Sequence, residues 1–295
     1  MNKNQRKWLI ISIIIIIIVL GLGLGLGLGL KKQDIRSNFS EKYENQNVRA
    51  NLKYFSVVIV STCKNIEKEI KNSMTKVEMI GNLFKSYNVI LYENDSNDRT
   101  LDILKNWEKL NKNIKVISEK NVPGNRTNRL SRGRNILLNE AKKIRPDYLV
   151  IVDMDTVIHG LTEENFISSF KYKDWVFMGA NQNSTYYDLW ALRTYDDWMP
   201  FDCWDCVHKK NSPGFNYCVV NRYKKINKNK NLIKVKSAFG GLGIYDMKFI
   251  LNNANNCVYY GGELNKSEVC EHVSFNECLL KNGGKLFINP NMINF

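Results

Sequence analysis

Two aspartates, Asp153 and Asp155, follow the almost wholly apolar run of residues 148–152. Two carboxylates at positions i and i+2 directly after a buried strand cannot both be buried without a counter-charge. At the carboxyl end of a strand they form a pair of hard oxygen ligands suited to Mg²⁺ or Mn²⁺. Such a metal would bridge a diphosphate and stabilise it as a leaving group. The alternative without chemistry is an aspartate that caps the next helix.

The chain around this pair alternates short apolar runs with amphipathic stretches. We predict strands at 55–60, 88–92, 114–117 and 148–152, and helices at 66–87, 100–110 and 129–143. This order is typical of a doubly wound α/β domain with a mostly parallel sheet flanked by helices, in which ligands bind at the carboxyl ends of the strands. The G-x-G-x-x-G and G-x-x-x-x-G-K-[ST] motifs are absent, so neither a dinucleotide cofactor nor ATP is expected.

Beyond Asp155 the pattern is less regular. We predict a strand at 175–179, a Gly-rich turn or strand at 238–245, a helix at 270–282 and a strand at 285–288 that ends at Asn289-Pro290. Residues 181–236 are rich in aromatic residues, Asn and Lys and have no clear period.

This layout resembles the GT-A (Rossmann-like) fold of nucleotide-sugar glycosyltransferases over about residues 55–295. The turn Glu93-Asn94-Asp95-Ser96-Asn97-Asp98-Arg99-Thr100 is similar to the acidic turn of family-2 enzymes, from which it departs at Asn94 and Asp95. Arg132-Gly133-Arg134-Asn135 resembles the Ala-Arg-Asn segment of the same fold. Residues 187–193 and 288–290 resemble fungal capsule-type α-mannosyltransferases more distantly.

The resemblance implies a donor site and a metal site. It places the nucleotide-sugar against Thr62, Glu93, Asp95, Arg132, Arg134, Asn135 and Asp153. Asp155 would hold Mn²⁺ or Mg²⁺, Asp153 would contact the ribose or a metal-bound water, and His272 would be the third metal ligand. Helical spacing puts Arg132 and Asn135 on one face of their helix and Arg134 on another, so only one arginine is expected to reach the diphosphate.

Glu271 and Asp188 are the catalytic candidates. Glu271 stands at the start of a predicted helix, where unpaired N–H groups and the helix dipole keep a carboxylate ionised and able to accept a proton from a sugar hydroxyl. The alternative is a helix-capping Glu beside a structural His272. Asp188 is the next candidate for the catalytic carboxylate if Glu271 is only a helix cap.

Acceptor contacts are expected from Trp190, Arg193, Gly240 and Gly241. A plain turn at the glycines, core packing of the aromatic residues and an Asp188–Arg193 ion pair are the alternatives.

The chain has 43 basic and 29 acidic residues, a net charge of +14. The chain is rich in Lys, Asn and Ile together, which resembles the coding bias of an AT-rich genome and offers an explanation of the positive charge other than nucleic-acid binding. Because the sequence also has no zinc-finger spacing and no RNA-binding aromatic signature, no nucleic-acid partner is expected. Seven cysteines leave at least one unpaired. Cys203, Cys206, His208 and Cys218 lack the second half of a zinc site, which favours a disulfide or simple packing.

Residues 8–30 form 23 positions without a charge. A helix of this length spans roughly 34 Å, enough to cross a bilayer. Because the run continues up to Lys31-Lys32, an uncleaved anchor is favoured over a cleaved signal peptide. We therefore expect a short tail at 1–7, a transmembrane helix at 8–30 and a tether at 31–51. The expected topology is type II, in an ER- or Golgi-like or virus-associated membrane.

A catalytic domain would then occupy residues 52–295, with a nucleotide-sugar-binding half at 52–158 and an acceptor-binding half at 159–295. The expected function is a hexosyltransferase, mannosyltransferase-like by the second resemblance, that moves a sugar from a nucleotide-diphosphate donor to a glycan or glycoconjugate acceptor. An inactive carbohydrate-binding membrane protein of the same fold is the main alternative. A metal-dependent phosphotransferase or nuclease would need more clustered acids and a phosphate-cradling loop, and the sequence has neither.

Overall fold

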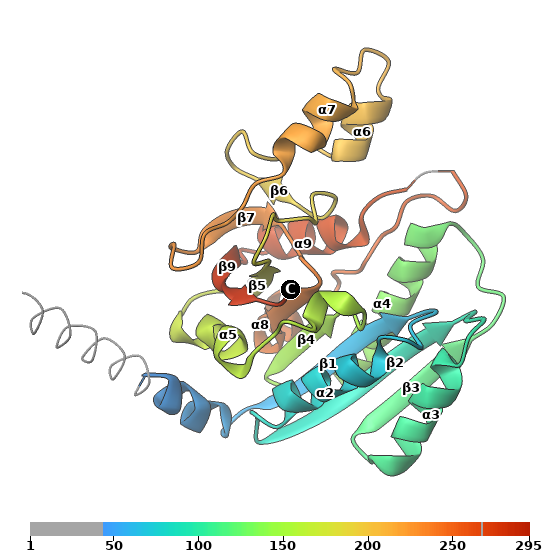
Figure 1. The fold of residues 1–295 in the computed structure, drawn as a ribbon, viewed down its shortest axis with the longest axis vertical. Coiled ribbons are helices and arrows are strands. Elements are labelled where there is room, and N and C mark those ends of the chain that lie inside the picture. Colours follow the sequence, from blue (N-terminus) through green and yellow to red (C-terminus); the bar gives the residue numbers. More distant parts are fainter. Residues whose placement is uncertain (1–43, 267) are drawn as a thin grey trace, which may run out of the picture. The chain divides into compact units, whose positions relative to one another are not determined.

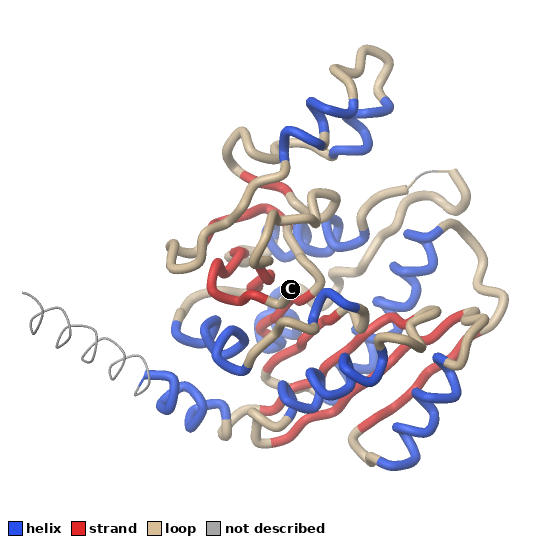
Figure 2. The backbone as a smooth tube through the Cα atoms, in the orientation of Figure 1, coloured by secondary structure: helices blue, strands red, loops and turns tan. Residues whose placement is uncertain are grey.

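A mixed sheet runs through the computed structural model, which describes residues 44–266 and 268–295 of the chain (Figures 1 and 2). Residues Val48–Phe295 form one compact unit. The strand order is β3-β2-β1-β4-β8-β5-β9-β7-β6. The strands are β1 (Ser56–Cys63), β2 (Ser86–Asn94), β3 (Ile114–Glu119), β4 (Tyr148–Val152), β5 (Phe177–Asn181), β6 (Arg193–Thr194), β7 (Ile233–Ser237), β8 (Leu242–Asp246) and β9 (Leu286–Ile293).

The first four strands pair in parallel, as predicted. They are connected by α2 (Ile70–Gly81), α3 (Thr100–Leu110) and α4 (Arg126–Ile144). Alternate residues of β1 point to opposite faces: Val57 and Ile59 pack with α2 and α3, whereas Val58 and Val60 pack with α4. Burial on both faces explains why these strands read as continuous apolar runs.

The remaining strands make the sheet mixed rather than mostly parallel. Strand β8 lies antiparallel between β4 and β5, and β9 is parallel to β5, while β7 and β6 are antiparallel to their neighbours. Strand β9 also continues through Pro290 instead of ending there. The pairing of β5 with β9 shifts register between Gly179 and Asn181, and a proline is tolerated at such a bulge because it need not donate to the ladder.

The helices of the second half are short except for α9. They are α5 (Glu163–Ile167), α6 (Cys203–His208), α7 (Phe215–Cys218), α8 (Met247–Asn253) and α9 (Glu271–Lys281), with 3₁₀ turns η1 (Thr156–Ile158), η2 (Ser168–Lys171) and η3 (Val220–Arg222). Helices α6 and α7 belong to an arm, residues 201–223, that projects away from the sheet (Figure 1). The Cys206–Cys218 disulfide closes this arm, so the preference for a disulfide over a zinc site is confirmed there.

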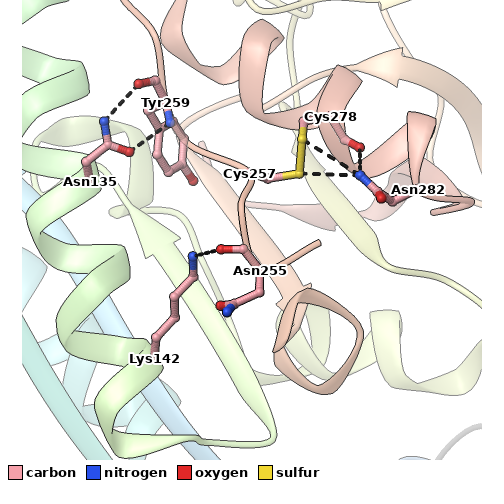
Figure 3. The surroundings of a disulfide bond; sticks show 7 residues. All are labelled: Asn135, Lys142, Asn255, Cys257, Tyr259, Cys278 and Asn282. Carbon is pink, nitrogen blue, oxygen red and sulfur yellow. Dashed lines mark hydrogen bonds between the residues drawn. A yellow bond between two sulfur atoms is a disulfide. The ribbon is translucent and has the colours of Figure 1, made fainter. Parts of the chain in front are cut away.

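A second disulfide, Cys257–Cys278, ties the segment after α8 to α9 (Figure 3). The same segment is held to α4 by Asn135, whose side chain donates to the carbonyl of Tyr259 and accepts from its N–H, both at 2.8 Å. Lys142 also donates to the carbonyl of Asn255. Helices α4 and α9 are thus fixed to one another on one face of the sheet.

Other predicted boundaries also differ from the structure. The helix predicted at 66–87 ends at Gly81, because the chain turns there and Leu83 and Phe84 enter the core. A side chain at position 81 would also clash with the ring of Tyr87. The predicted tether at 31–51 overlaps the folded unit, since Val48 is buried and Arg49 forms ion pairs with Glu163 and Glu164.

The predicted membrane segment at 8–30 lies outside the described residues. Within residues 44–266 and 268–295, no helix combines the length and the apolar character needed to cross a bilayer.

Candidate active site

A cavity of about 680 Å³ opens at the carboxyl ends of β1, β2 and β4. The strand ends contribute Thr62, Asn94, Asp153 and Asp155, and the first turns of α4 contribute Arg126, Arg129 and Arg134. Asp188 and Trp190, from the segment after β5, and Glu271 and His272, from the start of α9, complete the lining. Acidic and basic groups that are far apart in the sequence therefore face one space.

Asp153 and Asp155 leave β4 side by side. The N–H of Asp153 donates to the carbonyl of Gly241 at 2.9 Å, which anchors the strand end. Asp155 accepts a hydrogen bond from the N–H of Val157 at 3.0 Å and so caps η1, while it also lines the cavity. Burial, with the nearby carboxylates of Asp155 and Asp188, raises the pKa of Asp153 to about 6, although Arg134 opposes the shift.

Arg134 is the centre of a buried ion-pair network. Its Nε donates to Glu271 at 2.7 Å and its Nη2 to Asp153 at 3.3 Å, and its guanidinium lies 5.1 Å from the ring centroid of Phe239. Only 4% of the Arg134 side chain and 5% of the Glu271 side chain are exposed. Burial opposes the charge of Arg134, but the two carboxylates outweigh it and raise the pKa of Arg134.

Glu271 is therefore not a helix cap. The N-cap of α9 is Cys270, and the Glu271 carboxylate is directed to Arg134 instead of to the backbone of its own helix. Because Arg134 and Glu271 form a buried pair, Glu271 helps to hold Arg134 in place beside Asp153.

His272 is buried and neutral at the cavity wall. Its ring stacks on Phe239, with centroids 3.8 Å apart, and neither ring nitrogen has a hydrogen-bond partner. Burial and the charge of Arg134 lower the pKa of His272 well below its usual value. Among the described residues no group of three His, Cys, Asp or Glu side chains gathers closely enough to hold a metal ion, so His272 does not join Asp153 and Asp155 in a preformed triad.

Asp188 lines the cavity and, like Asp155, forms no ion pair with a described residue. It accepts hydrogen bonds from the N–H groups of Gly240 at 2.9 Å and Ala191 at 3.3 Å. Burial raises the pKa of Asp188 despite these two bonds. Arg193 does not pair with it, because Arg193 forms a buried ion pair with Asp202 and donates to the carbonyl groups of Trp190 and Leu192.

The two glycines face protein. Gly240 and Gly241 have φ of +70° and +81°, values that favour glycine. A side chain at position 241 would meet Val157 at 2.6 Å and the hydroxyl of Tyr187 at 3.0 Å. The pair forms a tight turn that presents its N–H to Asp188, and it does not line the cavity.

The predicted donor residues divide into two groups. Thr62, Arg134 and Asp153 line the cavity. Glu93 and Asp95 do not. Glu93 accepts hydrogen bonds from Ser96 and from Ser118 of β3, and Asp95 accepts them from the loop after β3, whereas Asn94 between them reaches the cavity.

Arg132 and Asn135 lie along a separate groove on α4. Arg132 forms a two-bond pair with Glu119, and Asn135 binds Tyr259. As predicted, the two arginines of this segment face different surroundings.

Sequence reasoning missed Arg126, Arg129 and Leu130. With Arg134 they follow the spacing i, i+3, i+4 and i+8, which places them on one face of α4 toward the cavity. The sequence predicts a helix that begins at residue 129, so Arg126 falls outside the predicted helix and its shared face with Arg134 is not recognised. The capping box of Asn125 and Asn128 fixes the true start at Arg126.

Comparisons with known proteins give one family. The model described as Glycosyl transferase family 2 matches residues 57–174. This segment runs from β1 to the approach of β5, so it contains Thr62, Asp153, Asp155 and the arginines of α4, but neither Asp188 nor Glu271. No curated protein sequence matches the chain.

Several solved structures resemble the chain at low identity. TarS 1-349 from S. aureus in complex with UDP-GlcNAc is 14% identical with a TM-score of 0.48, over 81% of this chain and 57% of that one. The mannosyltransferase PcManGT from Pyrobaculum calidifontis, in complex with GDP-Man and Mn²⁺, is 11% identical with a TM-score of 0.44, over 80% and 55%. GalNAc-T7 with UDP, GalNAc and Mn²⁺ is 15% identical with a TM-score of 0.48, over 80% and 43%. The chain thus spans about half the length of these structures.

Proposed function

We propose that this chain, a glycosyltransferase of the GT-A fold distantly related to family 2, transfers a sugar from a nucleotide-diphosphate donor to a glycan or glycoconjugate acceptor with the help of a divalent cation. The observation that carries the proposal is the cavity at the carboxyl ends of the parallel strands, where Asp153 and Asp155 face the cationic side of α4. Ligands of open α/β sheets bind at this edge.

The oxygen donors at this edge fit a divalent cation. Mg²⁺ and related ions are commonly held by one or two carboxylates together with phosphate oxygens of the substrate. Asp155 and the partly exposed Asp153 supply such carboxylates, and they need no third protein ligand when the donor completes the shell. Bound there, the cation would neutralise charge that develops on the departing diphosphate.

Three cations of the cavity remain for the diphosphate itself. Lys64, Arg126 and Arg129 line the cavity, and none of them forms an ion pair with a described residue. Arg134, in contrast, is already committed to Glu271 and Asp153. We therefore assign diphosphate binding to Lys64, Arg126 and Arg129, with Arg134 as the residue that positions Asp153.

Asp188 is the proposed base. A carboxylate whose pKa is raised above its ordinary value, as burial does for Asp188, is a more effective proton acceptor than an ordinary one. The Gly240 and Ala191 N–H groups hold Asp188 in place, so that it can accept the proton of the attacking acceptor hydroxyl as the bond between sugar and diphosphate breaks. Asp188 thus replaces Glu271, the first candidate for the base on the sequence alone.

Membrane attachment is part of the proposal. The uncharged run at residues 8–30 supports a type II anchor, with the catalytic unit held on the lumenal or exterior side.

A donor screen tests the proposed function. Purified chain is incubated with a panel of nucleotide-sugars and Mn²⁺, and released nucleotide is measured. We expect release with one donor, abolished by excess chelator and reduced at least about a hundredfold by Asp155→Asn, because charge stabilisation of a leaving group is worth several kcal/mol. Full activity in excess chelator would exclude the metal role, and no release from any donor would refute the function.

A further inference from the structure

The positive charge of the chain is concentrated in one segment outside the N-terminus. Residues 209–236, here called the basic segment, contain nine Lys or Arg residues and no Asp or Glu. Residues 1–36 hold six basic residues and one acid, so the basic segment accounts for all the remaining excess of the net charge of +14. The rest of the chain is balanced. The basic residues are Lys209, Lys210, Arg222, Lys224, Lys225, Lys228, Lys230, Lys234 and Lys236.

These cations are not used in ion pairs within the part of the chain that the structure describes. All but Arg222 and Lys236 are exposed. Asp196, Asp197 and Asp205 lie nearby in the sequence and offset three of the nine charges, which leaves a surplus of six. An excess of unpaired cations over neighbouring acids creates a positive potential that attracts anions.

Aromatic rings are interleaved with the cations. Lys234 and Lys236 each lie 5.3 Å from the ring centroid of Tyr195, and Lys224 lies 5.5 Å from that of Trp198. Arg222 lies 4.5 Å from the ring of Tyr217. Four of the nine cations of the basic segment thus lie beside aromatic rings.

This surface leads into the cavity. Val219 and Tyr223, in the basic segment, and Trp204, on α6, all line it, and the disulfide Cys206–Cys218 closes the arm that carries them. Tyr223 and Trp204 remain 45% and 38% exposed, and Trp204 meets the ring of Trp190 edge to face at 6.0 Å. Exposed aromatic rings at the mouth of a polar cavity suit the apolar faces of sugar rings.

We propose that the basic segment, together with the aromatic mouth of the cavity, captures an anionic glycan acceptor, one that bears phosphate, sulfate or carboxylate groups. The proposal rests on the proposed function, because it names the acceptor of the same site. The cations bind the acidic groups of the acceptor chain, and Trp204 and Tyr223 stack on the sugar whose hydroxyl enters the cavity. Continuity with the cavity selects a glycan over a membrane surface or a nucleic acid, since the acceptor must end where the donor binds.

Direct binding tests the inference without the donor. Full-length chain in non-ionic detergent is titrated against a labelled heparin oligosaccharide and against an uncharged dextran of equal length. We expect heparin to bind at least about tenfold more tightly than dextran, with an affinity that falls as salt rises. Equal affinities for the two would overturn the inference.

Charge reversal at two different places distinguishes binding by the basic segment from attraction by the net charge of the chain. Lys209→Glu with Lys210→Glu should weaken heparin binding at least about tenfold. Lys109→Glu with Lys112→Glu, beside β3 at the other end of the sheet, changes the net charge equally and should weaken it less than about twofold. Equal losses in both double variants would contradict the inference. Displacement of heparin by DNA or phosphatidylserine micelles at a lower concentration of charge than unlabelled heparin would also contradict it.

Transfer assays connect the surface to the site. With an acidic oligosaccharide acceptor, the Lys209→Glu, Lys210→Glu variant should raise the acceptor KM at least about tenfold and leave the donor KM unchanged. An unchanged acceptor KM would overturn the inference. Nucleotide binding with Mn²⁺ is measured on the same samples: a chain that binds heparin but no nucleotide fails the proposed function, whereas one that binds nucleotide but not heparin fails this inference alone.

Discussion

The buried network around Arg134 gives the sharpest prediction about how the site is held together. Arg134→Met keeps the length of the side chain and removes its charge, so that Glu271 and Asp153 lose their shared cation. Breaking a buried ion pair by removing one partner costs about 3–5 kcal/mol, because a buried charge is left uncompensated. For a unit of this size about 2–4 °C of Tm is lost per kcal/mol, which gives a fall of roughly 6–20 °C.

Arg132→Met is the matched control. It lies two residues away on the same helix and also pairs with a carboxylate, Glu119, but 52% of its side chain is exposed. An exposed pair contributes about 0–1 kcal/mol, so this variant should lose no more than about 4 °C. Urea unfolding of both variants, followed by circular dichroism, gives the two free energies directly.

The pH dependence supplies a second check with a definite sign. In Arg134→Met, protonation of the unpaired acids removes the buried charge. The difference in stability from the parent should therefore be largest near neutral pH and shrink as the pH falls toward the ordinary carboxyl range of about 4. Equal, small losses in Arg134→Met and Arg132→Met, or a difference that does not change with pH, would refute the reasoning.

Three further predictions concern the proposed base, the carboxylate of Glu119 and the N-terminal anchor. Asp188→Asn should lower kcat at least about a hundredfold with little change in Tm, whereas Glu271→Gln should lower Tm more than kcat; the reverse pattern would return the base to Glu271. The hydrogen bonds from Arg132 and Tyr92 lower the pKa of Glu119 to about 2, so Glu119 stabilises the fold above its unfolded pKa of about 4.5 and loses this effect as the pH falls toward 2. The free energies of unfolding of the parent and Glu119→Gln should differ by about 1 kcal/mol at pH 7 and converge near pH 2, and a difference that does not change with pH would contradict this. Deletion of residues 1–36 should yield a folded chain that needs no detergent, and aggregation of that product beside a parent that is soluble without detergent would refute the anchor.

Local patterns were sufficient for the parallel half of the fold. Apolar runs buried on both faces predicted β1 to β4, and the amphipathic period of residues 100–110 predicted α3 at its observed bounds. The placement of Asp153 and Asp155 at the cavity edge followed from the same rule, since both come directly after β4.

The second half depended on contacts that no local pattern records. Arg134 and Glu271 are 137 positions apart, and only the packing of α4 beside α9 pairs them. That pair explains why Glu271 is not a cap and why its carboxylate, unlike that of Asp188, is already bound to a cation. The period-free stretch at 181–236 likewise gave no sign that β6 and β7 join the sheet, or that the disulfide at Cys206 closes an arm beside the cavity.

The signal that was available and missed concerns α4. Arg126 and Arg129 share a face with Arg134, but this is visible only when the helix begins at Arg126. The Asn125 capping box marks that start, and a helix that begins there places Arg126 and Arg129 on the same face as Arg134, toward the cavity.

Calorimetric titration of nucleoside diphosphate into the chain is the most direct test of the central claim, that the cavity beyond β4 is a metal-assisted donor site. The titration is run with Mn²⁺ and with chelator, for the parent chain, for Asp155→Asn and for Arg132→Met, which lies outside the cavity. We expect the parent and Arg132→Met to bind the nucleoside diphosphate only with Mn²⁺. With Mn²⁺, Asp155→Asn should bind it at least about tenfold more weakly than the parent. Equal nucleotide affinity in the parent and Asp155→Asn, with or without Mn²⁺, would contradict the central claim.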